Sequence, residues 1–281
     1  MVYFEELFFT LALAIYLIAA VAFFVFVLTK KQQVGKAAVL ITIAGFLAHT
    51  TALVLRVIES GRLPFSNQFE FANSFTWSIV LCYLLLHFVY RFTSVGTFVV
   101  PLAFLMMGYA AMQPKTIKAL MPALQSRWLG LHVGTAIISY GSFAVAAGLA
   151  VMYLLAERQQ QGHLTQASQQ GGLGDSHVLP DAEVCDYLNY RLSAFGYLML
   201  TLVIITGAIW AKSAWSRYWG WDPKETWSLI TWLIYSAYLH LRFNRGWRGK
   251  RAAWFSVIGF ACVIFTFIGV NILLPGIHSY R

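Results

Sequence analysis

The most distinctive residues of the chain are tryptophans gathered in one short stretch. Six of the ten tryptophans in the 281-residue sequence lie between residues 210 and 232, namely Trp210, Trp215, Trp219, Trp221, Trp227 and Trp232. An indole has a large flat face and one N–H donor, so it suits a membrane interface or a planar aromatic ligand. The spacing Trp-Gly-Trp-Asp-Pro-x-Glu, which begins at Trp219, is too specific for an interfacial belt. We interpret the stretch as a binding site for a flat ligand.

Imidazole is a standard axial ligand of haem iron, and two histidines can serve such a site. His132 and His278 are both expected near the membrane face that carries the tryptophans. Two imidazoles and an aromatic platform on one face are what a bis-histidine haem site requires. Three cations flank the tryptophans and could pair with the two haem propionates: Lys212, Arg217 and Lys224.

Asp222 begins a pattern typical of the first turn of a helix. Asp222 suits the N-cap, Pro223 suits the first helical position, and Glu225 completes a capping box. The sequence therefore predicts a helix that starts below the tryptophan-rich segment. The Asp222 carboxylate could also orient the neighbouring indoles.

The remaining histidines within apolar runs are separate candidates. His240 is about 18 residues from Asp222, or about 27 Å along a helix, so it cannot bind the same iron as the outer pair. An ionisable residue within a span is a functional candidate, and an interfacial histidine near Arg242 is the alternative. We interpret His49 and His87 mainly as hydrogen-bonding residues between helices.

The composition indicates an integral membrane protein. Hydrophobic residues make up 59% of the chain and charged residues only 11%, against about 25% in soluble domains. The net charge of +9 does not predict nucleic-acid binding, because the basic residues lie in short loops at helix ends. Cys82, Cys185 and Cys262 stand alone, which excludes a disulfide framework and a covalently attached haem of the protein's own.

About eight apolar runs approach the ~20 residues needed to cross a bilayer. They are Leu7–Leu28, Ala37–Val57, Phe75–Phe92, Thr97–Met112, Trp128–Ala156, Leu192–Ala211, Thr226–Leu241 and Ala252–Leu274. The sequence therefore predicts an all-α polytopic fold that forms a single membrane domain over residues 1–281.

The positive-inside rule predicts the orientation. The loop between the seventh and eighth runs holds Arg242, Arg245, Arg248, Lys250 and Arg251, and the loop after the first run holds Lys30, Lys31 and Lys36. We predict that both loops are cytoplasmic, and that both termini and the 210–232 segment are extracytoplasmic. The polar residues 157–184, rich in Gln, Gly and Ser, are predicted to form a flexible cytoplasmic loop with His163 and His177 solvated.

Three motifs together resemble one family. The segment from Trp219 to Trp227 resembles the WWD signature of haem-handling membrane proteins, and within them the CcsA (ResC) family of system II cytochrome c biogenesis. The segment from Gly61 to Glu70 is similar to that family's Gly-x-x-Pro-x-Ser-Asn-x-x-Glu motif. The segment from Asp186 to Arg191 is similar to its Leu-x-Tyr-Arg motif. The resemblance extends from about Arg56 onward.

The resemblance implies a specific function and set of ligands. His132 and His278 correspond to the two outer histidines, and His240 to a histidine within the membrane. The implied substrate is haem b, which is received from the cytoplasmic side and presented at the outer site. There its vinyl groups react with the Cys-x-x-Cys-His thiols of an apocytochrome c. The implied partner is CcsB (ResB-type), and the implied location is a bacterial plasma membrane or a thylakoid membrane.

Three alternatives remain open at this stage. One is a CcmC-like protein that delivers haem to a chaperone, although about eight spans and His240 argue against it. Another is a b-type cytochrome subunit that keeps its haem as an electron carrier. The third is a transporter or scaffold without haem, in which the tryptophans form only an interfacial belt.

Overall fold

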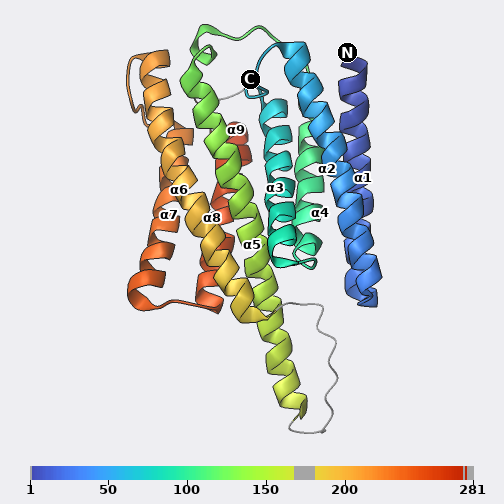
Figure 1. The fold of residues 1–281 in the computed structure, drawn as a ribbon. Coiled ribbons are helices and arrows are strands. Elements are labelled where there is room, and N and C mark those ends of the chain that lie inside the picture. The colour runs from blue at the N-terminus through green and yellow to red at the C-terminus, as the bar shows by residue number, and fades with distance from the viewer. Residues whose placement is uncertain (1, 168–180, 275, 277–281) are drawn as a thin grey trace.

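The computed structural model describes residues 2–167, 181–274 and 276, and these residues form a bundle of helices without strands (Figure 1). The long helices are α1 Val2–Thr29, α2 Gln32–Ser60, α3 Gln68–Tyr90, α4 Gly96–Ala111, α5 Arg127–Ala167, α6 Ala182–Trp215, α7 Pro223–Arg245 and α8 Lys250–Ile264. A 3₁₀ turn, η1 (Pro122–Leu124), precedes α5. The last helix continues from α8 through a π-helical turn, η2 (Phe265–Gly269), into α9 (Val270–Leu273). The predicted all-α fold is confirmed.

Helices occupy all eight predicted spans. Six of them are long and apolar enough to cross a bilayer, namely α1, α2, α3, α5, α6 and the continuous helix that begins with α8. The helix α4 is apolar but has only 16 residues, and α7 is more polar, with charged residues in its first and last turns. The chain is a polytopic integral membrane protein.

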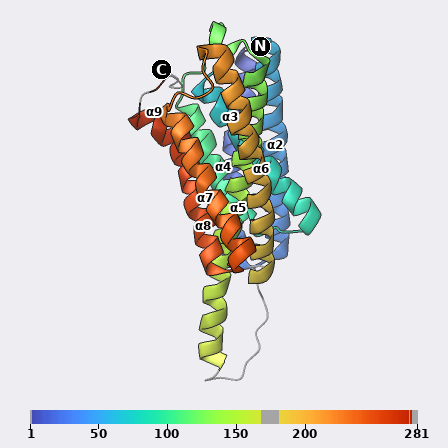
Figure 2. The ribbon, with the colours of Figure 1, turned by 90° about the vertical axis from the view of Figure 1, so that its left-hand side faces the viewer.

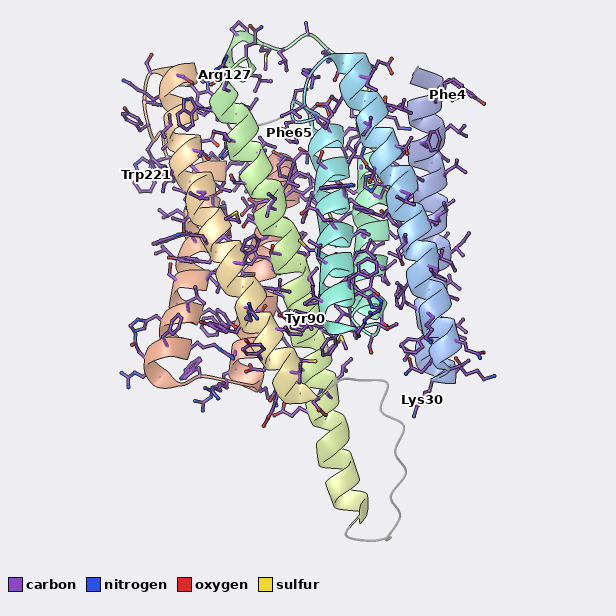
Figure 3. The ribbon with its side chains drawn as sticks, in the orientation of Figure 1. Phe4, Lys30, Phe65, Tyr90, Arg127 and Trp221 are labelled. Atoms are coloured by element: carbon purple, nitrogen blue, oxygen red, sulfur yellow. The ribbon has the colours of Figure 1, made fainter. Side chains whose placement is uncertain are left out.

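The connections between helices alternate between two ends of the bundle. We call the end that holds residues 216–222 the upper end. Trp221, Phe65, Arg127 and Phe4 lie at this end, whereas Lys30 and Tyr90 lie at the opposite, lower end (Figure 3). The two basic connections, at residues 30–31 and 246–249, are both at the lower end (Figure 1). Helices α7 and α8 run side by side, with α9 at the upper end (Figure 2).

Both ends of the predicted 157–184 loop are helical. Helix α5 continues to Ala167 and projects beyond the lower end, and α6 already begins at Ala182 (Figure 1). The prediction was therefore wrong for residues 157–167 and 182–184. The physical reason is that residues 157–167 include Glu157, Arg158 and four glutamines, which are good helix formers although they are polar. His177 lies outside the described residues, and of His163 only the helical backbone is described.

Helices α5 and α6 pack closely because small residues face each other. Ser139 Oγ donates a hydrogen bond of 2.8 Å to the Gly196 carbonyl across the interface. A Cβ atom at Gly196 would lie 2.7 Å from the Phe143 ring, so only glycine fits there. Small residues that allow close backbone approach are typical of helix contacts in membranes. This contact sets the spacing of the two helices that hold most of the site.

A buried ionic cluster anchors the connection between α2 and α3 at the upper end. The Glu70 carboxylate, which is fully buried, accepts from Arg56 Nη2 at 3.0 Å and from Arg62 Nη1 at 2.8 Å. It also accepts from the backbone N–H and hydroxyl of Ser66, at 2.9 and 2.8 Å. Asn67 caps α3 by accepting from the Glu70 N–H. The Gly61–Glu70 motif therefore folds around one carboxylate.

Replacing Glu70 is expected to destabilise the protein strongly. In Glu70→Gln, Arg56 keeps its buried charge, with Glu5 at 3.2 Å as its remaining carboxylate partner. Breaking a buried ion pair on one side typically costs about 3–5 kcal/mol. We expect a clear loss of thermal stability in detergent. The matched control is Glu6→Gln, which removes the exposed Lys115 pair and should change little. Equal melting temperatures for the two variants would contradict the role assigned to Glu70.

Candidate haem-presentation site

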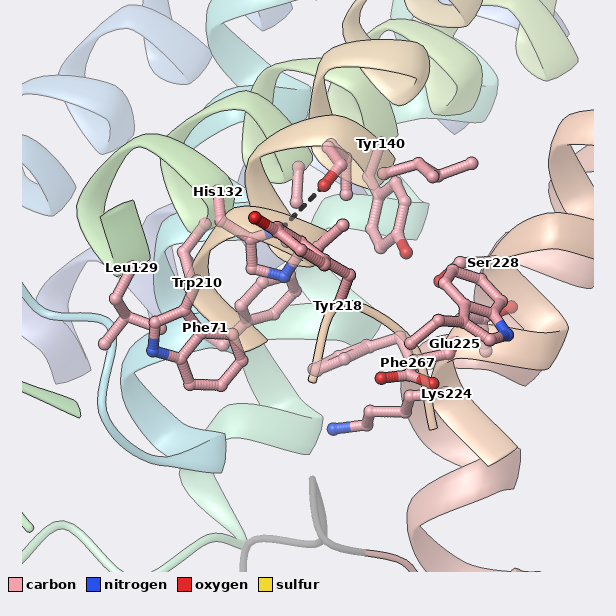
Figure 4. Close-up of a pocket in the computed structure, with 18 residues that line it drawn as sticks. Phe71, Leu129, His132, Tyr140, Trp210, Tyr218, Lys224, Glu225, Ser228 and Phe267 are labelled. Carbon is pink, nitrogen blue, oxygen red and sulfur yellow. Dashed lines mark hydrogen bonds between the residues drawn. The ribbon is translucent and has the colours of Figure 1, made fainter. Parts of the chain in front are cut away.

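A cavity of about 110 Å³ opens at the upper end between α5, α6, the start of α7 and η2 (Figure 4). The residues that line it include His132 and Tyr140 from α5, Gly207 and Trp210 from α6, Tyr218 and Trp219 from the connection, Lys224, Glu225 and Ser228 from α7, and Thr266 and Phe267 from η2. The wall is mainly aromatic and aliphatic. Lys224 and Glu225 lie across the cavity from His132 and Trp210 (Figure 4).

His132 is held in one tautomer by a backbone carbonyl. Its Nδ1 lies 2.9 Å from the Val203 carbonyl oxygen, and because a carbonyl can only accept, Nδ1 must carry the hydrogen. The lone pair is therefore on Nε2. An N–H bond from the second ring nitrogen to a carbonyl is the usual arrangement of metal-binding histidines, because it fixes the ring and raises its basicity. The second ring nitrogen of His132 is thus held in the way that is usual for metal-binding histidines.

Trp210 supports the His132 ring and is itself fixed. The two rings stack with centroids 5.8 Å apart and planes 20° apart. Trp210 is only 4% exposed, and its Nε1 donates a hydrogen bond of 2.8 Å to the Ala123 carbonyl in η1. Trp215 packs edge-on against Trp210, with centroids 4.8 Å apart. Trp210 therefore supports the histidine and also lines the cavity, and Trp215 supports Trp210.

Gly207 lets the imidazole reach the backbone of α6. A Cβ atom at Gly207 would lie 2.7 Å from His132 Cε1 and 2.8 Å from Nδ1, far closer than any real contact. Gly207 is four residues after Val203, so its side-chain position lies beside the carbonyl that receives the hydrogen bond. Sequence reasoning missed this residue. A glycine inside an apolar span was the signal available, since such a glycine usually has a packing reason.

The connection between α6 and α7 is gathered around one carboxylate. Glu225 Oε2 accepts from the backbone N–H of Gly220 at 2.7 Å and of Asp222 at 3.2 Å. The Asp222 side chain accepts from the Lys224 N–H at 3.1 Å and from the Glu225 N–H, and the second of these bonds completes the predicted capping box. Trp221 adopts a left-handed backbone with φ of 55°, and its side chain is 70% exposed. The chain therefore turns sharply at this cap, and the Trp221 indole is exposed to solvent.

Of the three cations predicted to flank the site, Lys224 lines the cavity. Burial lowers the pKa of Lys224 to about 7, although the nearby Asp222 carboxylate raises it. A carboxylate bound in the cavity would favour the charged form of this amine. Lys212 instead donates to the Ser216 carbonyl at 3.0 Å and lies over the Tyr218 ring. The Arg217 guanidinium would be 2.7 Å from a Cβ atom at Gly220, so it covers that backbone.

The C-terminal segment meets the cap of α7. A Cβ atom at Gly276 would lie 2.3 Å from Asp222 Oδ2 and 3.0 Å from the Pro223 ring. Glycine is therefore required where this segment passes the start of α7. Gly276 is two residues before His278 in the sequence, and His278 itself lies outside the described residues. Asp222 thus has a second neighbour that its capping pattern did not reveal.

The sequence was also compared with known proteins. Residues 65–278 match the family described as Cytochrome C assembly protein. The chain belongs to this family. It is 36% identical over 270 residues to the cytochrome c biogenesis protein CcsA of Synechococcus sp. (strain CC9902), covering 90% of this chain and 88% of the relative. It is 39% identical over 256 residues to CcsA of Prochlorococcus marinus (strain MIT 9303), covering 83% and 80%.

A solved structure has a fold similar to that of this chain. The cytochrome c heme lyase CcmF superposes with a TM-score of 0.70 over 94% of this chain, at 17% sequence identity. This chain spans about half of that protein, 46% of its length. At this identity the likeness concerns the fold alone. The bundle of this family member therefore has a counterpart among solved membrane proteins.

The other predicted site residues lie at different places in this family member. Trp219 lines the cavity. The Trp221 ring packs edge-on against the Trp219 ring, with centroids 5.8 Å apart. Trp227 packs against Phe265 of η2, with centroids 4.2 Å apart, and is not part of the cavity wall. His240 is exposed near the lower end of α7, where its Nδ1 accepts from Asn244 Nδ2 at 2.9 Å. It is remote from the cavity, as its sequence position indicated.

The two histidines interpreted as bonding between helices behave differently. His49 is fully buried and bonds to Tyr16 Oη at 3.2 Å and to Asn73 Oδ1 at 2.8 Å, which confirms that interpretation. For His87, the buried Nδ1 has no hydrogen-bond partner among the described residues. Its ring packs beside Tyr83, with centroids 6.2 Å apart. The interpretation is therefore not supported for that nitrogen.

Substitution of Gly207 is expected to displace the histidine. In Gly207→Ala, the added methyl group overlaps the His132 ring, so the ring must move and its bond to Val203 must weaken. Overpacking of this kind typically costs about 1–3 kcal/mol. We expect a severalfold lower haem affinity, measured by titration of the Soret band, together with a lower melting temperature. The matched control is Gly134→Ala in α5, where a Cβ atom meets nothing within 4 Å. Identical haem binding by the two variants would contradict this role of Gly207.

The contact between Asp222 and Gly276 can be tested by a double-mutant cycle. Gly276→Ala should weaken haem binding at least severalfold, because its methyl group overlaps the Asp222 carboxylate. Asp222→Ser keeps a good N-cap but removes that carboxylate, so it should have a milder effect. The double variant should bind haem better than Gly276→Ala alone. Strictly additive losses would show that the two residues do not meet.

Proposed function

We propose that this chain presents haem at its upper-end cavity and, together with a CcsB partner, attaches it to apocytochrome c. The observation that carries the proposal is the geometry of His132. Its Nδ1–H is committed to Val203, so the metal-binding lone pair is on the nitrogen further from α6, in the cavity wall. The family and the relatives named CcsA support the same function.

His132 and His278 are the proposed axial ligands of the haem iron. His278 follows Gly276, which touches Asp222 at the start of α7, and the adjacent Lys224 and Glu225 line the cavity. This contact puts Gly276, two residues before His278 in the sequence, near the cavity that His132 lines. Haem b with two imidazole ligands suits this arrangement. The imidazoles would bind the iron from the two faces of the haem and leave the vinyl groups at its edge accessible.

The cavity size indicates that the macrocycle is not fully enclosed. A volume of about 110 Å³ is below the ~300–1,000 Å³ of sites that surround a whole ligand. We propose that one edge of the haem enters between His132 and the start of α7, where a propionate would pair with Lys224. The remaining edge would lie beneath the exposed Trp221 and Tyr218. An open edge is what an incoming polypeptide needs.

The chemistry requires position more than acid or base catalysis. Each cysteine thiol of the Cys-x-x-Cys-His motif adds across one vinyl double bond. A sulfur–carbon bond forms, the thiol hydrogen goes to the other vinyl carbon, and no group leaves. Holding reactants in a near-attack geometry can supply up to ~7–11 kcal/mol of the barrier. The protein contributes by fixing the iron through His132 and the propionate through Lys224.

We also propose the orientation that the basic connections predict. The lower end, which carries residues 30–31 and the 246–249 connection with the basic residues that flank it, would face the cytoplasm, and the cavity would open on the extracytoplasmic or lumenal side. His240, exposed near the lower end, would then meet haem or a partner histidine at an earlier stage of transfer. The membrane would be a bacterial plasma membrane or a thylakoid membrane.

The test is covalent haem on a Cys-x-x-Cys-His reporter. The chain is expressed with its CcsB partner in cells that lack their own maturation system. We expect haem-stained reporter with the wild type, a loss of at least tenfold in His132→Ala and His278→Ala, and little change in the control His163→Ala. Full activity of His132→Ala would overturn the proposed site. A red protein that matures no reporter would instead favour a b-type carrier or delivery of haem to a chaperone.

A further inference from the structure

We infer that the Gly61–Glu70 motif positions one wall of the upper-end cavity, through a hydrogen bond between Gln68 at the start of α3 and Asn271 in α9. These two residues are 203 positions apart in the sequence. Their bond joins the motif to the last helix, whose turn η2 supplies Thr266 and Phe267 to the cavity wall. The inference rests on the proposed function and deepens it, because it gives the motif a role at the haem site.

The side-chain amide of Asn271 donates two hydrogen bonds. Its Nδ2 lies 2.8 Å from the Phe267 carbonyl oxygen and 2.7 Å from Gln68 Oε1. Because a carbonyl can only accept, the nitrogen of this amide, and not its oxygen, must face Phe267. Its two hydrogens then serve both acceptors. Gln68 therefore presents its oxygen to Asn271 and its nitrogen to Tyr109 Oη, at 2.7 Å.

The Phe267 carbonyl belongs to a turn that is wider than an α turn. The Val270 N–H donates to the Phe265 carbonyl, five residues earlier, which is the π-helical pattern. A π turn contains one extra residue, so it rotates the residues around it relative to a regular helix. The Asn271 side chain gives the Phe267 carbonyl a donor inside this turn. It thereby stabilises the conformation in which Thr266 and Phe267 line the cavity.

The start of α3 meets the same turn at a second point. Gln68 and Phe71 are three residues apart, so they lie on one face of the helix. The Phe71 ring packs on the Phe267 ring, with centroids 4.9 Å apart and planes 35° apart. Both phenylalanines line the cavity (Figure 4). This wall is therefore a pair of rings, and the bridge from Gln68 to Asn271 fixes their relative position from one turn away.

The Gly61–Glu70 motif holds Gln68 in place. Asn67 caps α3 by accepting from the Glu70 N–H, and the Glu70 carboxylate is held by two arginines. Gln68 lies between these two anchored residues and is 6% exposed. An apolar side chain would pack here without a directional bond, whereas an amide fixes both a distance and an angle. The position of the motif is thus passed on to the cavity wall.

The inference is tested with two apolar substitutions of similar size, Gln68→Met and Asn271→Leu, each of which removes the bridge. We expect each variant to bind haem about threefold to tenfold more weakly in a titration of the Soret band, the effect of losing one or two hydrogen bonds. The double variant should bind no more weakly than Asn271→Leu alone, because the bridge is already lost there. Strictly additive losses would contradict a shared bridge.

The matched control is Thr50→Val, which removes the hydrogen bond of 2.9 Å from Trp77 Nε1 between α2 and α3, outside the cavity wall. This variant should have a lower melting temperature and an unchanged haem affinity. If Gln68→Met behaved in the same way, its bridge would be an ordinary structural contact and the inference would be overturned.

A second measurement needs no haem. In the full chain, 4-fluorophenylalanine replaces Phe267, and its fluorine NMR signal reports the surroundings of the ring. We expect Gln68→Met to shift or broaden this signal and Thr50→Val to leave it in place. An unchanged signal in Gln68→Met would overturn the inference whether or not the chain binds haem. The expected shift in a chain that binds no haem would overturn the proposed function alone.

Discussion

The hydrogen bond from His132 to the Val203 carbonyl depends on the way α5 packs against α6, and the site depends on this bond. A ring N–H in an apolar wall needs an acceptor, and in a helix the carbonyls are already engaged with the helix itself. The carbonyl of Val203 can accept from the His132 ring only because Gly207, one turn later, has no side chain. The interhelical spacing is set by contacts further along, such as Ser139 with the Gly196 carbonyl.

Two carboxylates that are largely shielded from solvent, one at each end of the bundle, are neutralised within the chain. At the upper end, Glu70 receives Arg56, Arg62 and Ser66, and so ties the 61–67 connection to α3. At the lower end, Asp186 receives both guanidinium nitrogens of Arg242, at 2.8 and 2.7 Å, and the Gly249 N–H at 3.0 Å. This bidentate pair joins the starts of α6 and α8 to the end of α7.

At the upper end, the tryptophan-rich stretch divides into parts with different roles. Trp210 supports the histidine and lines the cavity together with Trp219, Trp215 supports Trp210, and Trp221 is exposed. Trp227 packs on the π-helical turn, whose Thr266 and Phe267 line the cavity. A π turn displaces the residues around it and often lies near functional sites. Here the π turn η2 packs against the start of α7.

Apolar length and local pattern were sufficient to predict much of this protein. The eight helical spans, the cap formed by Asp222 and Glu225, and the separation of His240 from the outer site all follow from periodicity and helical rise, which are local properties. The predicted loop was wrong at residues 157–167 and 182–184, because polar residues with good helix propensity can continue a helix beyond an apolar span. Only the tertiary structure revealed Gly207, the contact of Gly276 with Asp222, and the cavity position of Lys224. Each of these depends on a distance between segments far apart in the chain, and such distances are decided by the packing of helices, which no local pattern records.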